Sequence, residues 1–600
     1  MTIVGHIDIF HDGVFLYFLG RIFLIKKLAK SIREYKTSAL LTPLYMIGEV
    51  AMEVLIPTLM ALIIDNGVYQ NDVSYIVKLS IMIVFAAIFS MLFGIMGAYS
   101  GSKASCGFAK NLRHDLFFHI QDFSFKNIDS FSTSSLITRL TTDVQNVQQA
   151  FQMTIRICFR APIMFVFAII MVIHNSGTLV AVFAVAIPVL AIACAFFIKR
   201  VFPIFNRIFK HYDKLNRVIE ENLIGIRTVK AYVREEEEKE KFDSSSRAIH
   251  DDFVKAQKMM VMINPLVQSV SYACILAICY FGARLISVGS MGTGELMSVF
   301  TYTMQILSSL IMIAMIVVNL SMSKASAERI IEVLDASPEM DLNENGLKKV
   351  EDGSICFDHT NFSYSGNNTP LVLHNINLDI KSGEMVGLLG PTGSGKSSLI
   401  SLIARLYDVT SGSVSVGGHN VKDYDIKALR DGVSVVLQKN TLFSGTVRSN
   451  LLWGNENATD EELIWALKSA NADFIFSSKD GLDSVVEQGG NNFSGGQKQR
   501  LCIARALVKK PKVLIFDDST SAVDTQTDHQ IRNALRRDVK NCTKIIIAQR
   551  VNSVMDADKI VVLENGYIDD VGTHDELLMR NRTYQDLVKV QLGGKENGEN

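Results

Sequence analysis

A glycine-rich loop between an apolar run and a helix-forming run is the most chemically specific stretch of the sequence. Residues 390–397 have the spacing G-x-x-x-x-G-K-[ST], directly after the apolar run 385–389. Backbone N–H groups in such a loop surround a β-phosphate, its lysine reaches the β- and γ-phosphates, and its last hydroxyl ligates Mg²⁺. The residues that we expect to bind nucleotide here are Gly390, Pro391, Thr392, Gly393, Ser394, Gly395, Lys396, Ser397 and Ser398. Alone, the loop is also compatible with a kinase or a GTPase.

A second phosphate-binding feature follows further along the chain. A short motif begins at Phe493, just before a helical pattern. It continues with one hydroxyl residue, two glycines and one amide, namely Ser494, Gly495, Gly496 and Gln497. A helix N-terminus presents unpaired N–H groups and the positive end of the helix dipole to phosphate oxygens. This stretch therefore predicts a second contact with a nucleotide.

Two carboxylates end the next apolar run. Residues 513–516 read as a short buried parallel strand, and Asp517 and Asp518 follow it. Ligands of open α/β sheets bind beyond the carboxyl ends of the strands, and carboxylates there suit Mg²⁺ beside a nucleotide. These elements predict an α/β P-loop domain.

Taken in order, the motifs at 390–397, 493–497, 513–518 and 521–524 resemble those of the ATP-binding cassette (ABC) ATPases. The resemblance covers nearly the whole chain, because the part before the cassette is similar to the membrane half of an ABC exporter. It implies that two cassettes enclose two ATP molecules, each between one cassette's P-loop and the other's signature motif at 493–497. It also implies that Tyr364 stacks on adenine, although a tyrosine at a strand end is the simpler interpretation. Its Mg²⁺ ligands would be Ser397, Gln438 and Asp517.

Two positions depart from that family pattern. Asp518 stands where the family has the glutamate that positions the attacking water, and Gln549 stands where it has a histidine. Aspartate is one methylene shorter, and a displacement of about 1 Å costs about a hundredfold in rate. A neutral amide donates hydrogen bonds to a phosphate but cannot take up a proton or carry a positive charge. The chain thus resembles the degenerate-site subunit of bacterial heterodimeric multidrug exporters, which binds ATP and hydrolyses it poorly.

The composition agrees with a membrane protein. The 600 residues are 48% hydrophobic, with a mean hydropathy of +0.23 and a net charge of −1. A chain this close to neutrality offers no electrostatic argument for a nucleic-acid partner. The eight cysteines lack the spacing of a metal site.

Apolar runs and basic residues predict a six-helix transmembrane domain. Basic residues gather on one side of the membrane, in residues 26–36 and in the long connections 100–160 and 199–260. The positive-inside rule places this side in the cytoplasm, and we expect the membrane to be the plasma membrane. The runs fall at 39–64, 79–99, 161–173, 179–198, 261–286 and 296–320. The expected parts are an N-terminal extension with an interfacial helix (1–36), an all-α transmembrane domain (37–334), a linker (335–348), the nucleotide-binding domain (349–590) and a disordered tail (591–600).

Each long cytoplasmic connection reads as helix and turns once. The turns fall near 127–134 and 225–232, and they resemble the two coupling helices of ABC exporters. A solvated hairpin tip is the alternative, and the acidic run 235–238 fits that description.

The substrate is suggested only by Glu49 and Glu53, one turn apart in the first membrane helix. Intramembrane carboxylates usually face a cavity or a partner. We expect them to line the translocation path and to favour hydrophobic or cationic amphipathic compounds; interhelical hydrogen bonds that stabilise packing are the alternative.

The leading hypothesis is one half of an ATP-driven, multidrug-type exporter that works with a second half-transporter subunit in the lipid bilayer. A homodimeric exporter is the first alternative, and an ATP-gated regulatory or channel-like ABC protein is the second.

Overall fold

The computed structural model describes residues 27–592 except 339, 341–342, 344, 365–369 and 519–524. These form two compact units, one of residues up to Gln121 together with Thr133–Ala336, the other of Asp122–Ser132 together with the residues from Ser337 onward. The N-terminal extension up to residue 26, the motif at 521–524 and the tail from 593 lie outside the described residues.

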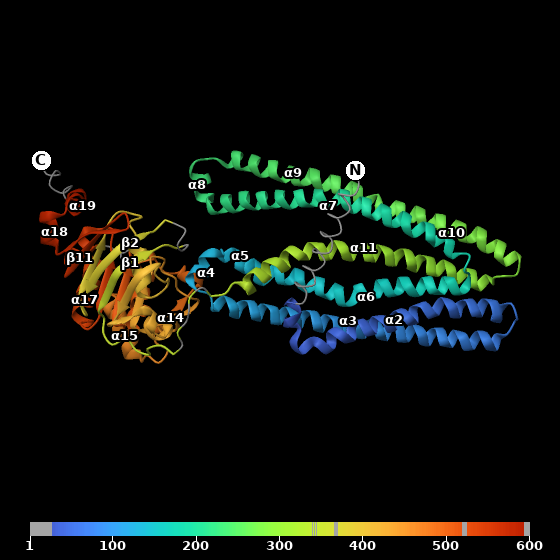
Figure 1. Ribbon diagram of the computed structural model, residues 1–600, viewed down its shortest axis with the longest axis horizontal. Coiled ribbons are helices and arrows are strands. Elements are labelled where there is room, and N and C mark those ends of the chain that lie inside the picture. Colours follow the sequence, from blue (N-terminus) through green and yellow to red (C-terminus); the bar gives the residue numbers. More distant parts are fainter. Residues whose placement is uncertain are drawn as a thin grey trace, which may run out of the picture. The chain divides into compact units, whose positions relative to one another are not determined.

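The first unit is all-α (Figure 1). Six helical stretches of the described chain are long and apolar enough to cross a membrane, which confirms the six expected spans. Their main helices are α2 (Lys36–Leu62), α3 (Val73–Gln121), α6 (Val144–Asn175), α7 (Val180–Ile224), α10 (Ile263–Ser287) and α11 (Thr293–Asp335).

Small residues and buried hydroxyls hold these helices together. A Cβ on Gly97 of α3 would lie 2.2 Å from Met46 Cε of α2, so a larger residue there would displace the Met46 side chain from between the helices. The Tyr302 hydroxyl of α11 is fully buried and donates to the Val54 carbonyl at 2.9 Å. Asp65, just after α2, accepts from the Gly294 N–H at 2.7 Å and so caps the start of α11.

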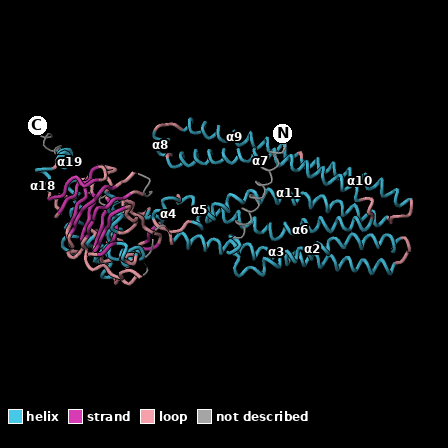
Figure 2. Tube along the Cα trace, viewed as in Figure 1, coloured by secondary structure: helices cyan, strands magenta, loops and turns pink. Residues whose placement is uncertain are grey.

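Short helices occupy both turns expected in the two long connections. The first turn holds α4 (Phe125–Ser130) and α5 (Thr133–Thr138), and the second holds α8 (Ile226–Ala231) between α7 and α9 (Glu235–Val261) (Figure 2). The acidic run forms the first turn of α9, where the helix dipole favours negative charge. The segment that contains α4 belongs to the second unit.

The second unit is built on a mainly parallel six-stranded sheet in the order β12-β11-β3-β10-β9-β6, with β12 antiparallel. An antiparallel sheet in the order β2-β1-β4-β5 accompanies it. The strands of the large sheet are β3 (Met385–Leu389), β6 (Val433–Val436), β9 (Val513–Asp517), β10 (Thr543–Ile547), β11 (Lys559–Glu564) and β12 (Tyr567–Gly572); those of the second sheet are β1 (Ile355–Phe362), β2 (Leu373–Ile380), β4 (Ser411–Val416) and β5 (His419–Asn420).

Both faces of the large sheet are buried, which explains its continuous apolar strands. On β9, Leu514 and Phe516 belong to one hydrophobic core, and Val513 and Ile515 belong to the other. The surrounding helices include α12 (Lys396–Ile403), α14 (Val447–Leu451), α15 (Asp460–Ser469), α16 (Gly495–Val508), α17 (Thr525–Asp538), α18 (His574–Arg580) and α19 (Arg582–Leu592). The expected combination of a six-helix membrane domain and an α/β P-loop domain is confirmed.

Candidate functional site

Four parallel strands of the large sheet deliver the site residues to one edge. In register, Ile547 of β10 lies between Leu388 of β3 and Asp517 of β9, and Val436 of β6 lies beside Phe516 of β9. Because neighbouring parallel strands end at the same edge, the segments that follow them meet there.

The loop after β3 has the backbone of a phosphate cradle. Gly390 has a φ of +151°, and a Cβ there would lie 2.1 Å from the Leu563 carbonyl oxygen, so no other residue fits. Gly393 has a φ of +86° with nothing within 4 Å of its would-be Cβ, so the loop is open on that side. Lys396 Nζ donates to the Gly390 and Pro391 carbonyls at 2.8 Å each. Burial lowers the pKa of this ammonium, and Asp518 and Asp517 oppose that shift.

Ser397 and Asp517 fit a magnesium site. The Ser397 hydroxyl donates to Asp517 Oδ1 at 2.9 Å. Neighbouring oxygens around Mg²⁺ also lie about 2.9 Å apart, because each is about 2.0–2.1 Å from the ion at a right angle. Burial raises the pKa of the Asp517 carboxyl, and the hydrogen bond from Ser397 opposes the rise.

Asp518 and Gln549, the two departures from the family pattern, bind each other. Gln549 Nε2 donates to Asp518 Oδ2 at 2.7 Å, and Gln438 Nε2 lies 3.5 Å from the same oxygen. Asp518 has a φ of +47°, in the left-handed region that non-glycine residues rarely adopt. Burial raises the pKa of the Asp518 carboxyl, and the Gln549 hydrogen bond opposes the rise. Gln438 thus lies beside Asp518, whereas Ser397 and Asp517 form a separate pair.

Tyr364 lies beside the P-loop helix. Its hydroxyl is 2.9 Å from Ser398 Oγ of α12, and its ring packs edge-on against Tyr407 at 5.1 Å. Tyr364 also lines a depression of about 260 Å³. Sequence reasoning missed Tyr407, which donates a hydrogen bond to Asp129, because no local pattern links those two residues.

Ser494 and Gln497 form the capping box of α16. Gln497 N–H donates to Ser494 Oγ at 3.3 Å, and the Ser494 N–H donates to Gln497 Oε1 at 2.9 Å. Gly495 and Gly496 begin the helix directly after the cap. The bonds described for this box are local and do not reach the residues at the strand ends.

Glu49 and Glu53 share a basic partner that sequence reasoning missed. Arg160 of α6 approaches Glu53 Oε2 at 2.9 Å and Glu49 Oε1 at 3.4 Å. Glu49 Oε2 is buried without a hydrogen-bond partner among the described residues. The sequence did offer one signal for this partner, because an arginine stands directly before the apolar run 161–173.

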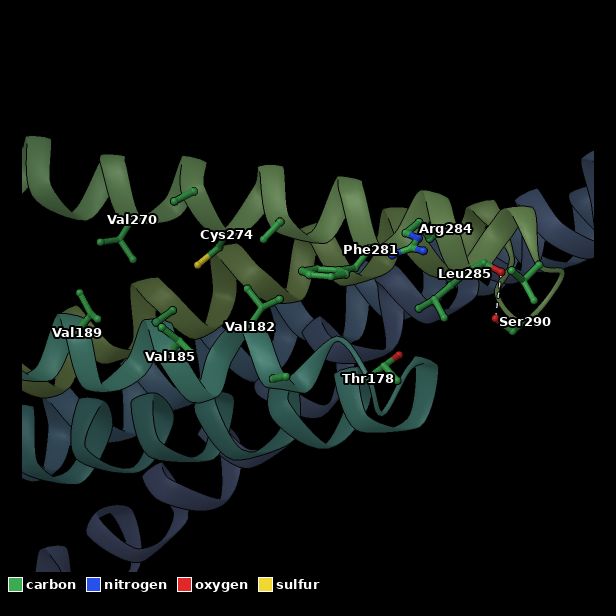
Figure 3. A pocket seen from close by; sticks show the side chains of 15 residues that line it. Thr178, Val182, Val185, Val189, Val270, Cys274, Phe281, Arg284, Leu285 and Ser290 are labelled. Carbon is green, nitrogen blue, oxygen red and sulfur yellow. Dashed lines mark hydrogen bonds between the residues drawn. The ribbon is translucent and has the colours of Figure 1, made fainter.

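A cavity of about 860 Å³ lies between α7 and α10 in the membrane unit. Figure 3 shows Val182, Val185 and Val189 on one wall and Val270, Cys274 and Phe281 on the other, with Arg284 near one end. Neither Glu49 nor Glu53 lines it, so the structure does not bring the expected substrate-path carboxylates into this cavity.

Comparisons with known proteins agree over both units. Residues 40–310 match the ABC transporter transmembrane region, and residues 373–521 match the ABC transporter family. An uncharacterized ABC transporter ATP-binding protein of Mycobacterium tuberculosis is 36% identical over 574 residues, or 95% of this chain and 98% of that protein. YfiB of Bacillus subtilis, which carries the same description, is 34% identical over 571 residues, or 95% of this chain and 99% of that protein.

A solved structure shares the complete fold. It is described as a bacterial Atm1-family ABC exporter with ATP bound, with a TM-score of 0.77 and 24% identity over 95% of this chain and 99% of that chain. The chain therefore belongs to the ABC transporter family, as a multi-pass membrane half-transporter with the fold of an ABC exporter, whose cassette is an ATPase coupled to transport.

Proposed function

We propose that this chain is the poorly hydrolysing half of a heterodimeric ABC exporter. The observation that carries the proposal is the 2.7 Å hydrogen bond from Gln549 to Asp518. Both residues stand at positions where hydrolysis needs a longer carboxylate and an imidazole. Here the shorter carboxylate accepts a hydrogen bond from the amide.

Geometry and charge both weaken hydrolysis at this site. A general base must reach about 2.6–3.2 Å from the proton that it takes, and the Asp518 side chain is one methylene short of a glutamate. The Gln549 amide already donates to one carboxylate oxygen, which lowers the basicity of that oxygen. The amide remains neutral, so it gives developing phosphate charge less stabilisation than an imidazolium.

Nucleotide binding at the same site is intact. Lys396 would exchange its two carbonyl acceptors for phosphate oxygens, and Tyr364 would stack on adenine. Ser397 and Asp517, with Gln438 nearby, would hold Mg²⁺. The ion would neutralise phosphate charge.

The signature motif of this chain serves the other ATP site. Ser494, Gly495, Gly496 and Gln497 lie at the N-terminus of the fourteen-residue helix α16 and have the full motif. The partner subunit would supply a P-loop, a glutamate and a histidine to complete a competent site. ATP closes the two cassettes, and hydrolysis at that site resets them.

The cassette and the N-terminus lie in the cytoplasm, and the chain resides in the plasma membrane. The proposed domain boundaries remain those expected from the sequence, at 1–36, 37–334, 335–348, 349–590 and 591–600. The turns with α4 and α8 would be the coupling helices that transmit nucleotide state to the membrane.

Hydrophobic or cationic amphipathic compounds are the proposed substrates. The wall of the cavity between α7 and α10 is almost entirely apolar. Two carboxylates and one guanidinium give the Glu49–Glu53–Arg160 cluster a formal charge of −1, which favours a cation. The cluster and the cavity would contribute separately to the path.

The test compares ATP hydrolysis by this chain alone with hydrolysis by the purified pair. We expect the pair to be at least about tenfold faster, because only its second site has a full catalytic set. Ser494→Ala in this chain removes the hydroxyl from that competent site, so we expect a loss of about a hundredfold in the pair.

Thr459→Ala is the matched control, because Thr459 and Glu462 form the same capping box on α15. Both variants lose about 1 kcal/mol of capping free energy, but only Ser494→Ala removes a signature hydroxyl. Equal rates for the chain alone and the pair would overturn the heterodimer and favour a homodimeric pump.

A further inference from the structure

The last described helix, α19, reaches the loop that follows β10. Gln591 Nε2 donates to the Gln549 carbonyl oxygen at 2.8 Å, and the Val551 N–H donates to Gln591 Oε1 at 2.8 Å. One side-chain amide therefore satisfies a backbone acceptor and a backbone donor two residues apart. It holds the loop as a neighbouring strand would.

The helix that carries Gln591 is itself firmly anchored. Tyr584 is fully buried, and its hydroxyl lies 2.6 Å from His574 Nδ1 of α18. The Thr583 hydroxyl donates to Glu564 Oε2 at 3.1 Å, which ties the start of α19 to the end of β11. Gln591 itself is exposed, so its two hydrogen bonds are its main contribution to the cassette.

Gln549 is consequently fixed from two sides. Its carbonyl is held by Gln591, and its side-chain amide donates to Asp518 Oδ2 at 2.7 Å. Val551 follows as a fully buried anchor, so the loop has little freedom between these points. A change in how α19 packs would reach the Gln549 backbone through the Gln591 side chain.

We propose that Gln591 is a positioning residue for the loop that faces the terminal phosphate, and that α19 thereby sets how long nucleotide stays at this chain's own site. The inference rests on the proposed function in one respect, namely that the Gln549 amide faces the γ-phosphate. Freeing the Gln549 carbonyl and the Val551 N–H lets the loop leave the phosphate more often, and the bound nucleotide then dissociates faster.

Two substitutions separate the two hydrogen bonds. Gln591→Ala removes both bonds. Gln591→Glu keeps an acceptor for the Val551 N–H but cannot donate to the Gln549 carbonyl. Gln585→Ala is the matched control, because Gln585 lies on the same helix and its amide donates to the Leu578 carbonyl instead.

Nucleotide retention is measured on the full-length chain in its purified assembly. The chain is labelled by azido-ATP with Mg²⁺, chased with excess ATP for increasing times and then irradiated, so that the label remaining on this chain reports its own site. Amide hydrogen exchange at Val551 is followed in parallel. Lys396→Ala is included, because its loss of label shows that the signal comes from this P-loop.

We expect Gln591→Ala to release nucleotide about tenfold faster, a change of about 1.4 kcal/mol, within the range of two neutral hydrogen bonds. Gln591→Glu is expected to behave similarly, and Gln585→Ala to match the wild type. Faster exchange at Val551 with unchanged release would overturn the inference while leaving the proposed function intact. An effect of Gln585→Ala as large as that of Gln591→Ala would also overturn it. Failure of the proposed function shows differently, as equal ATP hydrolysis by the chain alone and by the pair.

Discussion

Two clusters in this chain have the same formal composition, two carboxylates and one cation, and opposite internal bonding. In the membrane unit, Arg160 contacts both Glu53 and Glu49, at 2.9 and 3.4 Å. In the cassette, Asp517 accepts from the Ser397 hydroxyl and Asp518 accepts from the Gln549 amide, while Lys396 donates to two backbone carbonyls.

The first cluster pairs opposite charges with each other, whereas the second presents its charges where a ligand is expected to bind. In the half-buried membrane cluster the arginine pairs with both carboxylates, and its loss leaves their charges uncompensated. The cassette residues keep their charges directed to the edge of the sheet, where phosphate and Mg²⁺ would complete them. Replacing the cation is therefore expected to lower the affinity for ATP in the cassette and the stability of the protein in the membrane unit.

The largest effect is expected from Lys396→Ala. The substitution removes the main cation that would contact the β- and γ-phosphates. We therefore expect the affinity for ATP at this site to fall about a hundredfold, or about 2.7 kcal/mol. Labelling by azido-ATP measures the change. Lys559→Ala is the control, because Lys559 donates to the Asp379 carbonyl at 2.7 Å but lies outside the P-loop. Unchanged labelling would show that the loop has been misassigned.

Arg160→Gln is expected to act on stability instead. It leaves the half-buried Glu49 and Glu53 without their cation, and we expect the cost to be smaller than the about 3–5 kcal/mol of a fully buried pair. We expect a lower melting temperature of the purified protein. A triple variant with Glu49→Gln, Glu53→Gln and Arg160→Gln removes every charge and is expected to recover most of the loss. A triple variant as unstable as Arg160→Gln would contradict the ion-pair explanation.

The sequence predicted the cassette more completely than the membrane cluster for a physical reason. The P-loop, Asp517 and the cap at Ser494 depend on neighbouring residues and on strand order, which local patterns reveal. Glu49 and Glu53 were recognisable as costly charges, but Arg160 is more than a hundred residues away, and helix packing alone brings it near them.

The same limit applies within the cassette. The departures at Asp518 and Gln549 were visible from the sequence, yet their mutual hydrogen bond follows from adjacent strands β9 and β10. The contact of Gln591 with the loop after β10 had no sequence signal, because a glutamine in a final helical turn is ordinary. Local chemistry was predictable, and contacts between distant segments were not.

A smaller effect is expected from Glu49→Gln. The change brings the membrane cluster from a charge of −1 to zero and keeps the shorter Glu53–Arg160 pair intact. We expect transport of a cationic dye into vesicles to fall about threefold, while a neutral dye of similar size is transported as before, because only the cation gains from the extra carboxylate. Equal losses for both dyes would mean that Glu49 supports packing and does not select charge.

The smallest effect is expected from Asp518→Asn in the purified pair. Asparagine keeps the shape of the side chain and an oxygen that accepts from Gln549, but it removes the carboxylate. If this carboxylate is already too short to act as the base, the pair retains more than about half of its ATP hydrolysis. Asp518→Glu with Gln549→His is the complementary variant, because it supplies the longer carboxylate and the imidazole. We expect it to raise hydrolysis by this chain alone by about tenfold, since proton transfer by a well-placed group contributes about a hundredfold or more. A pair that loses most of its activity on Asp518→Asn would show instead that this site hydrolyses ATP with aspartate. The cassette cluster would then be a working catalytic site.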